Sequence, residues 1–136
     1  MKPNIDHLNR YVSDVERFTK FYQDVLGYEL IDKGKKETGM NYAILKGLSH
    51  ELFISEKEGF EGREENFRHI GYSVDNVDGL LAELKSKGYV DEGMQVVVKQ
   101  FSRQFYIKDP DGFEIDMIHW TDKAGFYKYL NTKKRE

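Results

Sequence analysis

The sequence predicts an α+β fold in which two βαβββ modules form an incomplete, barrel-like cleft. The first observation is a repeated unit. Residues 5–27 and residues 67–88 each fit a short strand, a polar cap and an amphipathic helix that ends at a glycine. The second observation is that both units have a histidine at the same place, since His69 lies 62 positions after His7. The same offset relates Val12 to Val74, Asp14 to Asn76 and Val15 to Val77. We interpret this agreement as one module used twice.

The bulk composition narrows the class of protein. With 136 residues, 39% of them hydrophobic, the chain can build one domain or two small halves that share a core. We expect a single domain over residues 1–120, made of modules 1–57 and 66–120, with a C-terminal helix and tail over 121–136. The net charge of −3 argues against a nucleic-acid surface, and the apolar runs are too short for a membrane span.

The absence of cysteine removes disulfides, thiolate metal sites and cysteine nucleophiles together. It is typical of a reducing compartment. No charged segment followed by an apolar one opens the sequence, so we expect no signal peptide and a cytoplasmic location.

The first module begins with a strand expected over residues 5–12. Ser13 and Glu16 have the spacing of a capping box, which predicts that a helix begins there. Gly27 is suited to ending that helix in a left-handed conformation. The apolar residues at helical spacing are Val15, Phe18, Tyr22, Val25 and Leu26. Three strands are then expected over residues 28–32, 41–45 and 51–55, with Gly34, Gly39 and Gly47 in the turns.

The second module follows a charged linker expected over residues 57–66. Its strand and its helix, which closes at Gly88, precede strands expected near residues 93–98, 101–108 and 113–118. The sequence Asp109-Pro110-Asp111-Gly112 predicts a turn between the last two strands. A final helix over residues 121–130 has no counterpart in the first module.

Alternation along each strand sorts its side chains onto two faces. The face opposite the helix carries His7 in the first strand, Glu51 in the fourth and His69 in the fifth, while Glu114 and Asp116 share it in the last. If these faces line one cleft, two imidazoles and two or three carboxylates converge there. Such a donor set suits Ni, Zn, Mn, Fe or Co, with positions left for water and substrate. Each residue alone is ordinary, because a lone histidine or glutamate is usually at the surface. The other two histidines, His50 and His119, have the parity of the helix face, and we expect no role for them in the site.

With those residues placed, the sequence resembles the vicinal oxygen chelate superfamily, which includes glyoxalase I, bleomycin-resistance proteins, fosfomycin-resistance transferases and extradiol dioxygenases. The resemblance extends to about Trp120. The motifs that carry it are Asp6-His7-Leu8, Val12-Ser13-Asp14, Leu26-Gly27-Tyr28, His69-Ile70-Gly71 and Asp109-Pro110-Asp111-Gly112. The set is specific for the fold and not for the reaction.

The resemblance implies His7, Glu51, His69 and Asp116 as the metal ligands. Asp116 stands where the family usually has glutamate, and Glu114 is the second choice for this position. Arg10 also departs from the family pattern, because the position is usually apolar. We expect its stem to run to the sheet edge, with a substrate-binding cation as the alternative.

The function implied is that of a metal-dependent lyase or isomerase of the glyoxalase-like type. It would chelate vicinal oxygens of a small substrate and stabilise an enediolate or oxyanion, with Glu51 as the catalytic base. The alternative is a metal-free binding or antibiotic-resistance protein that sequesters a small ligand between aromatic walls. Candidates for those walls are Tyr11, Tyr42, Phe53, Tyr106 and Trp120. Family members often dimerise, so a homodimer is expected, and the four ligands would come from one chain or from two.

Overall fold

The computed structural model describes residues 5–60 and 68–133. Its elements, in chain order, are β1 (His7–Val12), α1 (Val15–Leu26), β2 (Glu29–Lys35), β3 (Asn41–Lys46), β4 (Glu51–Glu56), β5 (His69–Ser73), α2 (Val77–Ser86), β6 (Val97–Val98), β7 (Ser102–Lys108), β8 (Glu114–Trp120) and α3 (Lys123–Lys133). The chain divides into two compact units. The first holds Met1–Phe67 and Lys108–Phe113, and the second holds Arg68–Ile107 and Glu114–Glu136.

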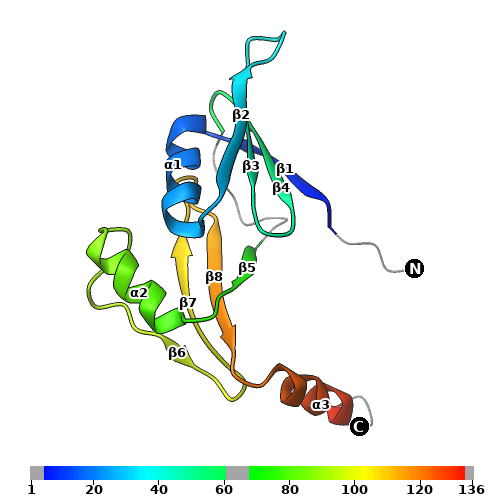
Figure 1. The fold of residues 1–136 in the computed structure, drawn as a ribbon, viewed down its shortest axis with the longest axis vertical. Helices are drawn as coiled ribbons and strands as arrows, with labels where there is room; N and C mark the ends of the chain where they lie inside the picture. Colours follow the sequence, from blue (N-terminus) through cyan, green and yellow to red (C-terminus); the bar gives the residue numbers. More distant parts are fainter. Residues whose placement is uncertain (1–4, 61–67, 134–136) are drawn as a thin grey trace. The chain divides into compact units, whose positions relative to one another are not determined.

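The two units repeat one sheet topology, as the sequence predicts. The first sheet has the order β1-β4-β3-β2 and the second has the order β5-β8-β7-β6 (Figure 1). The outer pair in each, β1 with β4 and β5 with β8, is parallel, whereas β2–β3, β3–β4 and β6–β7 are antiparallel. The α+β fold with a duplicated module is therefore confirmed. Neither sheet closes into a barrel within the described ranges.

Helix α1 covers one face of the first sheet (Figure 1). Its apolar stripe includes Phe18, Tyr22 and Val25, all buried, and this stripe forms the core with Leu45, Leu52 and Ile54 from the strands. In the second unit the core consists of residues from α2 and the strands, namely Val77, Leu81, Leu84, Phe105, Ile107, Ile115 and Met117. Polar side chains are thereby left for the other face of each sheet.

The start of α1 differs from expectation. Asp14, not Ser13, is the N-cap, and its carboxylate accepts from the Arg17 N–H at 3.0 Å. Ser13 instead donates its hydroxyl and its backbone N–H to Asp111, in the turn of residues 108–113. Gly27 ends the helix as expected, with φ of 69°.

The structure differs from the sequence-based expectation at Gly34 and in the sixth strand, and it describes only part of the expected linker. Gly34 lies within β2 and not in a turn. The sixth strand is only Val97–Val98, because a turn in which the Met94 N–H bonds to the Asp91 carbonyl occupies the start of the expected range. Much of the predicted linker lies outside the described residues, which resume at Arg68. Within the described ranges no helix has the length and apolarity to cross a membrane.

A buried ion pair joins β1 to the turn of residues 108–113 within the first unit. Arg10 Nη1 lies 3.2 Å from Asp109 Oδ2, with side-chain exposures of 12% and 0%. Tyr22 donates its hydroxyl to the same oxygen at 2.9 Å. Burial, followed by the charge of Asp109, raises the pKa of Tyr22 far above its ordinary value, so the phenol stays a donor. Arg10 also lies over the rings of Phe18 and Phe113. Arg10 is therefore held at the core by Asp109 and does not run to the sheet edge.

Candidate functional site

The first unit brings His7 and Glu51 together. They are register partners in the parallel pair β1–β4, so their side chains leave the sheet on the same face, opposite α1. The His7 ring stacks on Phe53 with centroids 4.8 Å apart. Its Nδ1 lies 2.8 Å from Asp6 Oδ2. A carboxylate at Nδ1 fixes the tautomer that carries the proton there, which leaves Nε2 with a free lone pair.

The second unit places His69 beside Glu114, its register partner in β5–β8. His69 Nδ1 and Glu114 Oε1 are 3.3 Å apart, close enough for an ion pair but without hydrogen-bond geometry. The Nδ1 atom is buried. A buried polar atom without a bonded partner is costly, and Glu114 is the nearest group that could bond to it after a small movement. The two histidines thus share one arrangement, a carboxylate close to Nδ1.

Asp116 lies on the same face as His69 and is buried. Gln104 Nε2 donates to both of its oxygens, at 3.1 and 3.0 Å, and Ser102 Oγ donates to Gln104 Oε1 at 2.8 Å. Burial raises the pKa of Asp116, and the charge of His69 and the Gln104 bond partly oppose that effect. Opposite Asp116 in the register is Gly71, where an added Cβ would meet no atom within 4 Å. The face beside Asp116 therefore has room at position 71.

Sequence reasoning missed Asp6 and Gln104. Asp6 immediately precedes His7, and its proximity could have suggested a partner for the imidazole. Ser102, Gln104 and Tyr106 alternate along β7, and that polar alternation was the available signal for Gln104. In the described part of the chain, no three histidine, aspartate or glutamate side chains gather in a group that could hold a metal ion. The convergence of all four predicted ligands stays a prediction.

The other two histidines form contacts outside the predicted site, as expected from the strand face predicted for them. His50 Nε2 is 2.6 Å from the hydroxyl of Tyr28, and His119 Nδ1 is 3.1 Å from the carbonyl oxygen of Val74. Each contact lies within one unit of the chain. They make these two histidines suitable controls for experiments on His7 and His69.

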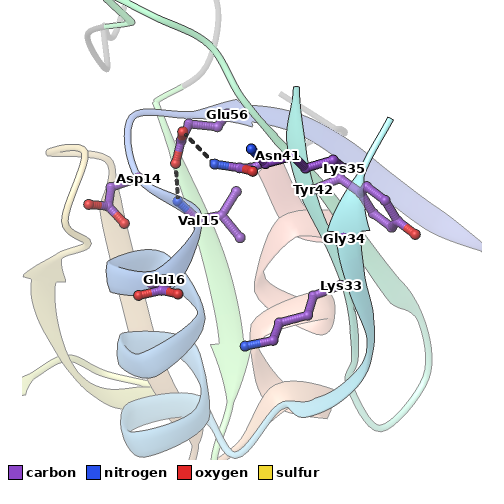
Figure 2. A pocket seen from close by; sticks show the side chains of 9 residues that line it. All are labelled: Asp14, Val15, Glu16, Lys33, Gly34, Lys35, Asn41, Tyr42 and Glu56. Carbon is purple, nitrogen blue, oxygen red and sulfur yellow. Dashed lines mark hydrogen bonds between the residues drawn. The ribbon is translucent and has the colours of Figure 1, made fainter. Parts of the chain in front are cut away.

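A hollow of about 520 Å³ opens on the helix side of the first sheet, and it is not the predicted site. Figure 2 shows it at the start of α1, where Glu56 accepts from the Val15 N–H at 3.0 Å and from the Asn41 amide at 3.0 Å. Lys33 and Lys35 line it together with the carboxylates of Asp14 and Glu16. No histidine lines this hollow, and the bonds of Glu56 and Asp14 hold the end of the helix.

Comparison with known proteins establishes the family. Residues 4–117 match the sequence model described as the Glyoxalase/Bleomycin resistance protein/Dioxygenase superfamily. The chain belongs to this superfamily. The match confirms the resemblance expected from the motifs and extends across most of the chain. It does not select one reaction, because members of one fold family carry out many.

Two curated relatives illustrate that range. A lactoylglutathione lyase from Schizosaccharomyces pombe is 26% identical over 141 residues, covering 84% of this chain and 46% of the relative. The chain thus spans about half the length of that lyase. A metallothiol transferase FosB from Lysinibacillus sphaericus is 27% identical over 130 residues, covering 92% of this chain and 89% of the relative.

Solved structures agree on the fold. A glyoxalase family protein from Enterococcus faecalis superposes with a TM-score of 0.71 at 24% identity, covering 85% of this chain and 96% of that one. A fosfomycin resistance protein, FosX, from Listeria monocytogenes superposes with a TM-score of 0.69 at 20% identity, covering 88% and 94%. At these identities the likeness is one of architecture.

Proposed function

We propose that the protein is a metal-dependent enzyme of the glyoxalase-like type, in which His7, Glu51, His69 and Asp116 hold a divalent ion. The observation that supports this most is the arrangement repeated around the two histidines. Each has a carboxylate near Nδ1, Asp6 at 2.8 Å and Glu114 at 3.3 Å. Metal-binding histidines usually direct the second ring nitrogen at a carboxylate or carbonyl, which orients the ring and raises its basicity.

The donor set fits a divalent transition metal. Two imidazole nitrogens and two carboxylates suit Ni, Zn, Mn, Fe or Co better than Ca or Mg, which prefer oxygen ligands alone. A bound ion would supply Lewis-acid polarisation of vicinal oxygens on a small substrate. We assign Glu114 the role of orienting His69, because Glu114 Oε1 lies 3.3 Å from His69 Nδ1, and retain Asp116 as the ligand.

Glu51 is our candidate for the base. It lies beside His7 on the face opposite α1 and is partly exposed, so a substrate can reach its oxygens. In the proposed reaction a Glu51 oxygen takes the proton from the carbon alpha to a carbonyl and returns it to the neighbouring carbon. The surrounding residues act by position, since Phe53 stacks on His7 and limits the rotation of that ring.

Metal binding is tested by calorimetry on chelator-treated protein titrated with Ni, Co, Zn or Mn, beside mass spectrometry of the ion that copurifies. We expect about one ion per predicted site. His7→Ala or His69→Ala should abolish tight binding, whereas His50→Asn and His119→Gln should retain it. Glu114→Gln should weaken binding roughly 10- to 100-fold, as loss of an orienting carboxylate does. Tight binding that survives His7→Ala and His69→Ala would overturn the proposal.

Activity is a separate test. A hemithioacetal of a 2-oxoaldehyde and a thiol is the probe substrate, and we expect conversion that a chelator stops and that the added metal restores. Glu51→Gln should remove turnover more completely than it removes metal binding. If the protein binds metal but does not convert the hemithioacetal, the proposed metal site stands and the proposed glyoxalase-like reaction is rejected.

A metal-free binding protein is the second candidate. The observation that favours it is Asp116, which is shorter than glutamate and already hydrogen-bonded to Gln104. Calorimetry that detects no metal, together with tight ligand binding unaffected by chelator, would select this function. A homodimer and a cytoplasmic location stay predictions, and size-exclusion chromatography with light scattering checks the first.

A further inference from the structure

A lysine from the β2–β3 connection reaches a buried serine on the face that carries Glu51. Lys36 Nζ donates to Ser55 Oγ at 2.8 Å. The serine is only 5% exposed, whereas Lys36 is an exposed residue. Ser55 follows Glu51 by four positions along β4, so both side chains leave the strand on one face, about 13 Å apart along it.

A second ammonium group lies at the neighbouring strand. Lys57 Nζ is 4.9 Å from the ring centroid of Tyr11, and Tyr11 is the register partner of Ser55 in β1–β4. Tyr11 is 49% exposed, so its ring presents apolar surface beside the serine. Lys36 therefore contacts Ser55 and Lys57 contacts Tyr11, and these two partners are neighbours on the face of the first sheet opposite α1.

Two carboxylates of this region, those of Glu56 and Asp32, are bonded elsewhere. Glu56 extends to the helix face, where it bonds to Val15 and Asn41 (Figure 2). Asp32 accepts the hydroxyl of Tyr42, whose ring lies close to Gly34. Within the described residues neither Lys36 nor Lys57 forms an ion pair with a carboxylate. Among the described residues the two ammonium groups are therefore left without a directly bonded carboxylate, although the whole chain carries a net charge of −3.

We propose that Lys36, Ser55 and Lys57 form a binding subsite for an oxyanion, the carboxylate or phosphate group of a small organic substrate. An ammonium group has three donors, and Lys36 uses one of them on the serine. The serine hydroxyl accepts that bond and keeps its own hydrogen to donate to the anion. The exposed ring of Tyr11 contacts the carbon skeleton next to the anionic group.

The position of the subsite deepens the proposed function, on which this step rests. A substrate with its oxyanion at Ser55 extends along β4 toward Glu51, and the separation of about 13 Å between the two residues limits its length. The class of substrate that fits is a small molecule with an anionic group at one end and vicinal oxygens at the other. Neutral analogues should bind more weakly.

The subsite is tested on chelator-treated, metal-free protein, so that the result does not depend on the proposed metal. Nuclear magnetic resonance of lysine side chains and backbone amides is followed while phosphate, and separately acetate, is added at constant ionic strength. We expect saturable shifts at Lys36, Ser55 and Lys57. Lys36→Met should weaken binding roughly tenfold, as loss of one charge-assisted hydrogen bond does.

Lys35→Met is the matched control, because Lys35 is the preceding residue but lines the hollow on the opposite face. It should bind the anions as the parent protein does. Lys36→Gln is a second variant at this position that also removes the charge. Thermal unfolding of both Lys36 variants shows whether either one has destabilised the β2–β3 connection. Unsaturable shifts, or equal weakening by Lys35→Met and Lys36→Met, would overturn the subsite. Intact anion binding in a protein that binds no metal would keep the subsite and reject the metal-dependent function.

Discussion

Gln104 donates its side-chain amide to both carboxylate oxygens of Asp116, and both residues are buried. The amide is one of the influences that lower the pKa of Asp116 against the larger effect of burial. The bond from Gln104 therefore favours the charged form of this carboxylate, against burial. It also holds the carboxylate in one orientation on the face that bears His69.

Replacing Gln104 by leucine should raise the pKa of Asp116 further, because desolvation then acts with less opposition. The measurement is the pH dependence of the Asp116 carboxyl carbon resonance in metal-free protein. Ser102→Ala, which removes only the bond to Gln104 Oε1, is the control and should change that pKa less. An Asp116 pKa that is the same in Gln104→Leu and the parent protein would contradict the role of the amide.

The raised pKa of Asp116 also predicts a pH dependence of stability. The folded state holds this proton more tightly than the unfolded state does. The contribution of the group to the unfolding free energy is therefore fully present below its ordinary pKa and is lost as the pH rises through the folded-state pKa. Asp116→Asn should gain stability relative to the parent protein between mild acid and neutral pH. Urea unfolding across that window measures it, and a constant difference would refute the linkage.

Arg10→Met should destabilise the protein by about 3–5 kcal/mol, because it leaves the fully buried Asp109 without its charge partner. Urea denaturation gives the value. Tyr22→Phe, which removes one hydrogen bond to the same carboxylate, should cost about 1 kcal/mol.

The double variant Arg10→Met with Asp109→Asn tests whether the cost comes from the unpaired charge of Asp109, since both charges are then absent. It should recover much of the loss seen in Arg10→Met. Additive losses in the double variant would mean that the two side chains contribute independently.

Gly27→Ala should cost about 1–2 kcal/mol, since φ of 69° places a non-glycine residue in the left-handed region. The Cβ itself would meet no atom within 4 Å, so the cost is one of backbone conformation alone. Gly93→Ala is a clean control, because Gly93 has open space and no positive φ, and it should leave the unfolding temperature nearly unchanged. Equal effects of the two substitutions would contradict this account.

Local patterns predicted the parts of the fold that depend on local physics. The stripe containing Phe18, Tyr22 and Val25 located α1, and alternation placed His7 and Glu51 on the correct face before their register was known. The cap was wrong because Ser13 and Asp14 are both good capping residues. What separates them is the distant Asp111, which binds Ser13.

Contacts between residues far apart in the sequence could not be predicted from the pattern of any single strand. Gln104 contacts Asp116 because β7 and β8 are neighbours in the sheet, and neither strand alone reveals that pairing. Arg10 was misjudged for the same reason, since its partner Asp109 is 99 residues away in the sequence. The set of His7, Glu51, His69 and Asp116 depends on two separate units and stays a prediction.

The turn of residues 108–113 belongs to the first unit although the strands on both sides of it belong to the second. A protein shortened to the amino-terminal module would keep the guanidinium of Arg10 and lose the carboxylate of Asp109 that neutralises it. The amino-terminal repeat should accordingly fail to fold when it is transplanted by itself into another scaffold.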